Sequence, residues 1–135
     1  MSFPSSRSRN RLYRVLISDD DPAIRRGLHL MLRSRGYHVS GYTTGRALVS
    51  DPEALAANCV IVDYRMPDID GFAILGQLRE KGWTGSAIMI SGFHDLALAQ
   101  RAREAGFDHV LAKPLIGRAL LDVIRRHRAQ IGFEG

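Results

Sequence analysis

Short apolar runs alternate along the chain with longer stretches in which apolar residues recur every three or four positions. Such runs are typical of strands, and such stretches are typical of amphipathic helices. The pattern predicts strands at 13–18, 37–42, 59–63, 86–91 and 109–112, and helices at 21–36, 43–58, 72–82, 94–106 and 116–132. Five strands, each followed by a helix, indicate an α/β fold with a parallel sheet covered on both faces. We expect the doubly wound, flavodoxin-like strand order 2-1-3-4-5, with its switch point between strands one and three.

The first predicted helix carries signals for both of its ends. Asp21 is a favourable N-cap, Pro22 suits the first helical position, and Gly36 is expected to stop the helix. The residues at helical spacing that we expect to face the core are Ile24, Leu28, Met31 and Leu32.

The second predicted helix is weaker. We expect an interruption near Asp51 and Pro52, because a residue before proline disfavours the helical conformation. The residues that we expect on its buried face are Leu48, Val49, Leu55 and Ala56.

The composition is that of one globular domain: 135 residues, of which 45% are hydrophobic and 24% charged. We assign residues 13–130 to this domain, 1–12 to a flexible basic tail, and 131–135 to a C-terminal tail or an artificial remnant. No apolar run reaches the roughly 18 residues of a membrane span, and no signal-peptide core is present, so we expect no membrane contact. The single cysteine, Cys59, excludes an intramolecular disulfide. We expect it to be a small buried hydrophobic residue in a cytoplasmic protein.

The formal net charge of +5 raises the question of nucleic-acid binding. Residues 1–14 contain four arginines and no acid, and residues 118–135 contain four arginines against Asp122 and Glu134. The remainder of the chain is therefore slightly acidic. Basic charge at chain ends more often marks solvated tails than a docking face. We accordingly expect no direct contact between this domain and nucleic acid.

Charged and hydroxyl side chains follow four of the predicted strands. Asp19 and Asp20 follow the first strand, Asp63 ends the third, Ser91 ends the fourth, and Lys113 follows the fifth. The carboxyl ends of parallel strands share the sheet edge at which α/β proteins bind ligands. Neighbouring carboxylates repel one another unless a cation lies among them, and hard oxygen ligands suit Mg²⁺. The set fits phosphoryl transfer to a carboxylate, with a lysine and a hydroxyl on the phosphoryl oxygens.

Each of these residues also has a simpler interpretation. The aspartates after the first strand are good N-cap residues, which explains Asp21 but leaves Asp19 and Asp20 unexplained. Ser91 alone is typical of a turn, and Lys113 alone is typical of a surface residue. The simpler interpretations lose weight because all these residues meet at one predicted edge.

Four segments in this order, "VLISDDDP", "VIVDYRMPDIDG", "MISG" and "AKP", resemble the receiver domain of two-component response regulators. The resemblance covers roughly residues 14–130. Any one segment is a weak signal, whereas all four on the predicted strand ends form a specific match. The resemblance implies the receiver fold and phosphorylation on aspartate with Mg²⁺ as cofactor, in a cytoplasmic bacterial signalling protein.

The resemblance also implies a role for each matched residue. Asp63 is the implied phosphoacceptor, Ser91 the switch hydroxyl, and Lys113 the lysine that contacts the phosphoryl group. No residue is implied to be catalytic beyond self-catalysed phosphorylation and dephosphorylation. The implied Mg²⁺ ligands are Asp19, mainly through water, Asp20, Asp63 and the backbone carbonyl of Arg65.

We therefore expect a signalling domain and not an enzyme. The implied phosphodonor is a sensor histidine kinase or a phosphotransfer protein, and the implied recipient of the signal is an effector domain or protein. In the family, the last two helices and the strand between them form the switching surface, which also mediates homodimers. One alternative is a Mg²⁺-dependent aspartyl phosphatase-like enzyme, but such enzymes commonly carry a second acid where this chain has Arg65. The other is a receiver-like binding module of a larger DNA-binding regulator.

The chain departs from the family pattern three residues before the lysine. An aromatic ring is usual there, and this chain has Val110. A β-branched side chain is stiff at χ1 and too small to imitate the movement of a ring. We expect the output to take another route, with Phe93, Phe107 and His109 as the candidates.

Arg65 and Phe93 stand two residues after Asp63 and Ser91, at positions that in the family flank the phosphoryl group and tune its hydrolysis. We predict that these bulky side chains restrict attacking water and make the phosphoryl state long-lived. The Arg65→Ala, Phe93→Ala variant should lose its phosphoryl group faster than the native chain, measured as the decay of phosphoprotein after donor removal. Decay no slower in the native chain than in the variant would refute the idea.

Overall fold

The computed structural model describes residues 12–92, 95–115 and 117–133. Most of the expected basic tail, Phe93 and the last two residues lie outside this part of the chain. The elements are β1 (Arg14–Ser18), α2 (Pro22–Ser34), β2 (His38–Tyr42), α3 (Gly45–Ser50), the 3₁₀ helix η1 (Pro52–Ala56), β3 (Cys59–Asp63), α4 (Gly71–Glu80), β4 (Ser86–Ser91), α5 (Leu96–Ala105), β5 (His109–Ala112) and α6 (Gly117–Gln130).

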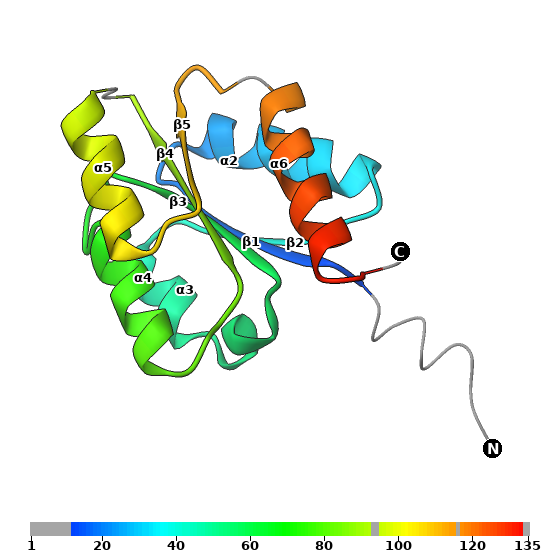
Figure 1. Ribbon diagram of the computed structural model, residues 1–135, viewed down its shortest axis with the longest axis horizontal. Coiled ribbons are helices and arrows are strands. Elements are labelled where there is room, and N and C mark those ends of the chain that lie inside the picture. The colour runs from blue at the N-terminus through cyan, green and yellow to red at the C-terminus, as the bar shows by residue number, and fades with distance from the viewer. Residues whose placement is uncertain (1–11, 93–94, 116, 134–135) are drawn as a thin grey trace.

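The five strands form one parallel sheet in the order β2-β1-β3-β4-β5, as predicted. Helices α2 and α6 cover one face of the sheet, and α3, α4 and α5 cover the other (Figure 1). The register pairs Ser18 with Val62 and Ser91 with Ala112. The carboxyl ends of the strands are therefore level, and the residues that follow them meet at one edge.

Burial follows the position of each strand in the sheet. Every residue of β3 and β4 is buried, whereas the edge strands β2 and β5 are partly exposed. Along the central strands, alternate side chains enter opposite layers of the core, because successive residues of a strand point to opposite faces. Ile61 and Ile88 pack under α2 and α6, and Val60 and Met89 pack under α3, α4 and α5. Cys59 is buried and unpaired, as expected.

Helix α2 begins and ends as predicted. The Asp21 side chain accepts hydrogen bonds from the N–H groups of Ala23 and Ile24, at 2.9 and 3.4 Å, and Pro22 is the first helical residue. Gly36 adopts a left-handed φ of 90° just beyond the end of the helix, which favours glycine. Of the predicted inward face, Leu28 and Leu32 are buried and the other two residues are half-buried.

The second helical stretch corrects part of the predicted core. Leu48 and Val49 are buried in α3 as expected, but Leu55 is 48% exposed and Ala56 is also exposed. The chain turns at Asp51, which caps η1. A 3₁₀ helix has about three residues per turn, so residues three positions apart face the same side. Ala54 and Ala57 are therefore the buried residues of this segment.

Among the described residues, no helix combines the length and apolar character needed to span a bilayer.

The close approach of α3 to α4 depends on Gly45. A Cβ at this position would lie 2.6 Å from Ile69 Cγ1 and 2.8 Å from Ile74 Cδ1, and Ile74 is fully buried. Gly45→Ala should therefore lower the free energy of unfolding by about 1–3 kcal/mol, as overpacked core positions do. The measurement is urea unfolding followed by circular dichroism.

Gly76 provides the matched control, because it lies within α4 and a Cβ there would meet no atom within 4 Å. Gly76→Ala should raise the free energy of unfolding by about 0.5–1 kcal/mol, since alanine restricts the unfolded chain. Equal stability of Gly45→Ala and the native chain would show that α3 and α4 are not in close contact.

Candidate functional site

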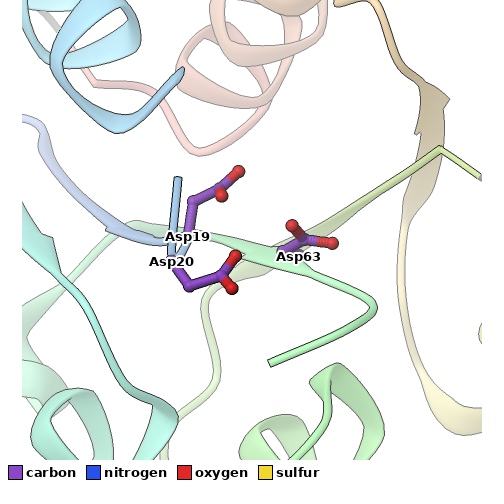
Figure 2. Close-up of side chains that lie close together, drawn as sticks. All are labelled: Asp19, Asp20 and Asp63. Carbon is purple, nitrogen blue, oxygen red and sulfur yellow. The ribbon is translucent and has the colours of Figure 1, made fainter. Parts of the chain in front are cut away.

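Three carboxylates meet at the carboxyl ends of β1 and β3 (Figure 2). Asp19, Asp20 and Asp63 each offer one oxygen, and these oxygens all lie within 4.8 Å of one another. Asp19 is fully buried, Asp63 is 5% exposed, and Asp20 is exposed. The cluster is thus open to solvent on the side of Asp20, and the sequence-based prediction that these aspartates meet is confirmed.

The position of Asp19 is set by its backbone. Its N–H donates to the carbonyl oxygen of Tyr42 at 3.2 Å, and its own carbonyl accepts from Arg25 Nη1 at 2.8 Å. The end of β1 is therefore fastened to both β2 and α2. The sequence offered no signal for the role of Arg25, whose side chain reaches back across the first turn of its helix.

One oxygen of the Asp19 carboxylate lacks a hydrogen-bond donor. Oδ1 accepts from the Asp21 N–H at 2.9 Å, but the buried Oδ2 has no hydrogen-bond partner and lies 3.5 Å from Lys113 Nζ. Burial raises the pKa of Asp19 above its usual range, and the charge of Asp63 adds to this effect. A buried carboxylate oxygen with unsatisfied acceptor capacity fits a cation among the three carboxylates.

Lys113 connects β5 to the acidic cluster. Its ammonium group donates to Asp63 Oδ2 at 2.6 Å. Desolvation acts to lower the lysine pKa, but the hydrogen bond to Asp63 and the charges of both aspartates outweigh it and hold the pKa above its ordinary value. Lys113 is therefore positively charged, and its charge partly offsets the repulsion between the carboxylates.

Ser91 lies at the end of β4, beside Lys113. It is 2% exposed, and its carbonyl oxygen accepts from the Lys113 N–H at 2.9 Å. The Arg65 N–H donates to Asp63 Oδ1 at 3.1 Å, and the Arg65 side chain is exposed. Lys113 and the Arg65 backbone therefore contact Asp63 directly, and Ser91 ends the neighbouring strand β4. The predicted metal-binding role of the Arg65 carbonyl stays a prediction, and Phe93 lies outside the described residues.

The loop between β3 and α4 is held by residues that the sequence did not reveal. Asp68 accepts hydrogen bonds from the N–H groups of Gly45 and Arg46, at 3.0 and 2.8 Å, and so fastens the loop to the start of α3. The Ser18 hydroxyl donates to Met66 Sδ at 3.7 Å. Because these partners are far apart in sequence, no local pattern could have paired them.

Aromatic rings extend from the end of β3 towards β5. Tyr64 meets Phe72 edge-on, and Phe72 meets Phe107 edge-on, each with 5.9 Å between ring centroids. Phe107 is buried just before β5, while Val110 is only partly buried against the same core cluster. His109, half-buried at the start of β5, has its pKa lowered mainly by desolvation.

Asp19, Asp20 and Asp63 together suit Mg²⁺. Carboxylate oxygens are hard ligands, Mg²⁺ commonly takes one or two of them and keeps several waters, and the exposed Asp20 leaves room for water and phosphoryl oxygens. Lys113 contacts Asp63 at the border of this cluster, and Ser91 ends the neighbouring strand β4.

The family comparison finds a match over most of the chain. A model described as the response regulator receiver domain matches residues 15–125. The match runs from β1 into α6 and includes all three aspartates of the cluster, Ser91 and Lys113.

Individual relatives cover much of this chain. Response regulator protein TmoT of Ectopseudomonas mendocina is 35% identical over 111 residues, which are 82% of this chain and 50% of TmoT. Transcriptional regulatory protein FixJ of Azorhizobium caulinodans is 32% identical over 121 residues, 90% of this chain and 57% of FixJ. The chain thus spans about half the length of these curated relatives. The crystal structure of a CheY-like response regulator receiver domain protein from Methanospirillum hungatei has a TM-score of 0.79 at 28% identity, covering 92% of this chain and 99% of that one.

The buried charge of Asp19 should destabilise the metal-free protein at neutral pH. Because the pKa of Asp19 is raised in the folded state, its ionisation opposes folding. This loss of stability begins as pH rises above the unfolded-state pKa and is complete above the folded-state pKa. Asp19→Asn should therefore raise the melting temperature in the presence of a chelator, by roughly 3–5 °C for each ~1 kcal/mol of repulsion removed.

The matched control is Asp122→Asn, which removes an exposed aspartate from α6 and should change the melting temperature little. Thermal unfolding by circular dichroism measures both variants. An unchanged or lower melting temperature for Asp19→Asn would mean that Lys113 already compensates the buried charge.

Proposed function

The chain belongs to the family of response regulator receiver domains, and from this premise we propose that Asp63 accepts a phosphoryl group from a phosphohistidine on a partner protein. The observation that carries the proposal is the 2.6 Å hydrogen bond from Lys113 Nζ to Asp63 Oδ2 beside the two other carboxylates. A carboxylate held against an ammonium group at an acidic edge is arranged for nucleophilic attack on phosphorus. The domain acts as a signalling switch.

The proposed transfer breaks one bond to phosphorus and forms another. A carboxylate oxygen of Asp63 attacks phosphorus while the bond from phosphorus to the histidine nitrogen breaks. The departing nitrogen keeps the electron pair and takes up a proton. Lys113 then moves its hydrogen bond from the carboxylate to a phosphoryl oxygen, and the Ser91 hydroxyl donates to another. A bound Mg²⁺ would supply positive charge that offsets the negative charge of the phosphoryl oxygens. The groups that would hold it are Asp19, Asp20, Asp63 and the Arg65 carbonyl.

The phosphohistidine partner has a docking surface directly beside Lys113. An apolar groove of about 390 Å³ runs between α2 and the segment that joins β5 to α6. Ile24, Met31, Pro114 and Leu115 are among the residues that line it, together with Lys113 itself. An apolar surface that includes the lysine suits a helix of a kinase or phosphotransfer protein whose histidine must reach Asp63.

The signal leaves the site through β5 and its two neighbouring helices, α5 and α6. The backbone hydrogen bond between Ser91 and Lys113 ties the two strand ends together, so that movement at one is felt at the other. Because Val110 cannot move as an aromatic ring does, we assign the coupling to the rings of Tyr64, Phe72 and Phe107. The same α5-β5-α6 surface is the proposed homodimer interface.

The effector is either a further domain or a separate protein. The relatives named as transcriptional regulators are longer than this chain, which fits a receiver domain joined to an output domain.

The buried, unpaired Cys59 fits the reducing cytoplasm that we expect for the domain. A phosphatase-like activity is disfavoured because Arg65 stands where a second acid would serve turnover.

The test is the intact mass of the chain after incubation with acetyl phosphate and Mg²⁺. We expect a gain of one phosphoryl group that is labile to mild base, because an acyl phosphate hydrolyses readily. Asp63→Asn and a chelator should each abolish the gain, while Asp122→Asn should leave it intact. Adduct formation on Asp63→Asn would identify another acceptor.

A purified phosphohistidine phosphotransfer protein serves as a second donor. Absence of an adduct with both donors, in a chain whose melting temperature rises with Mg²⁺, would overturn the proposal, because the metal site would then be present without the transfer.

A further inference from the structure

The outer surfaces of α2 and α6 are strongly basic. These two helices lie side by side on one face of the sheet (Figure 1). The only acidic residue within either helix is Asp122, which is exposed and lies on the same side of α6 as Arg118 and Arg125. The exposed arginines of the two helices and of the residue that caps α2 are Arg26, Arg33, Arg35, Arg118, Arg125 and Arg126.

Four of these arginines form two pairs, one on each helix. In α2, Leu28 and Leu32 are buried against the sheet, which places Arg26 and Arg33 on the opposite side of the helix. In α6, Leu120 and Ile124 are buried, which places Arg118 and Arg125 on the opposite side.

The spacing within the two pairs is the same. The members of each pair are seven positions apart in sequence, about 10 Å along a helix. These four arginines lie on the outer sides of two neighbouring helices, and we call them the arginine array.

The other helical layer differs in its charge pattern. Glu80 and Glu104 accompany the arginines of α4 and α5. Two of those arginines are also stacked on rings, Arg79 over Trp83 at 4.7 Å and Arg101 over Phe72 at 5.0 Å.

The fold therefore gathers positive charge on one face. The sequence did not indicate this basic face, because α2 lies in a part of the chain that has a slightly negative net charge. Only packing against α6 brings its arginines close to those near the C-terminal end.

We propose that the arginine array binds the phosphate backbone of a nucleic-acid duplex. Guanidinium groups match phosphate oxygens in a bidentate geometry, and several of them on a rigid frame release several counterions on binding. A protein partner is less suited to this surface, since a protein interface needs an apolar core. Between the paired arginines the array offers one large apolar side chain, Leu30, which is 62% exposed. Contacts to phosphates alone carry no sequence preference.

The test compares three variants of the whole chain that remove positive charge from different places. The first replaces the array: Arg26, Arg33, Arg118 and Arg125 to Gln. The second replaces the same number of arginines in the opposite layer: Arg46, Arg79, Arg101 and Arg103 to Gln. The third replaces Arg7, Arg9 and Arg11 of the basic tail by Gln. Fluorescence anisotropy with a labelled DNA duplex of mixed sequence, measured over a range of salt concentrations, gives the affinity and its salt slope.

We expect the array variant to lose about tenfold or more in affinity at low salt, and its salt slope to fall by about 3–4, since each phosphate contact contributes roughly 0.9. The opposite-layer variant should keep both the slope and most of the affinity. Circular dichroism and phosphorylation by acetyl phosphate check that each variant folds, so that failure here is distinguishable from failure of the phosphoacceptor proposal.

Three outcomes would overturn the inference. Equal losses in the first two variants would show an effect of total charge alone. A loss confined to the tail variant would move the binding site to the tail. Binding to phosphatidylserine vesicles through the array, without binding to the duplex, would identify a membrane surface as the partner.

Discussion

The burial of carboxylates at one edge of the sheet is the constraint on which the rest of the structure depends. Asp19 is fully buried beside Asp63, and one of its oxygens has no hydrogen-bond partner. Such an arrangement opposes folding unless positive charge compensates it. Lys113 supplies part of that charge from a strand two positions away from β3 in the sheet, and a bound cation would supply more. The electrostatic strain of the site and its suitability for a cation thus have the same physical origin.

The parallel sheet holds these groups in place through backbone hydrogen bonds between neighbouring strand ends. Because strand ends are level, the Lys113 N–H reaches the Ser91 carbonyl, and the Tyr64 N–H reaches the Ile90 carbonyl at 2.8 Å. The loop after β3 is then fastened to α3 by Asp68. A change in charge at Asp63 therefore acts on a set of strand ends and loops that are already bonded to one another. Local rearrangement in one of them biases the others, which is the property that a two-state switch requires.

The distribution of charge gives the domain two distinct surfaces. Acidic groups converge at the carboxyl edge of the sheet, and exposed arginines lie on the outer side of α2 and α6. The apolar groove beside Lys113 lies between these regions, along the inner border of α2. A partner that docks at the groove and a polyanion that docks on the arginines would therefore use neighbouring parts of the same helix. Electrostatic attraction at the basic face falls with salt, whereas docking in the apolar groove depends on buried area.

Much of the fold and most of the candidate site followed from local sequence alone. The five β-α units and the N-cap at Asp21 could be predicted because hydrophobic period and capping are properties of neighbouring residues. The strand order followed from the doubly wound class to which such α/β units belong. Asp19, Asp20, Asp63, Ser91 and Lys113 could be placed together because all of them follow strands of one parallel sheet.

Other features were decided only by tertiary structure, because their partners are remote in sequence. The turn at Asp51 moved burial from Leu55 to Ala54. The unsatisfied oxygen of Asp19 and the role of Asp68 appeared only once distant segments were packed together. The basic face likewise required α2 and α6 to become neighbours. Hydrophobic period specifies which residues face inward, but the charge and hydrogen bonding that a residue meets there depend on segments that only the complete fold brings into contact.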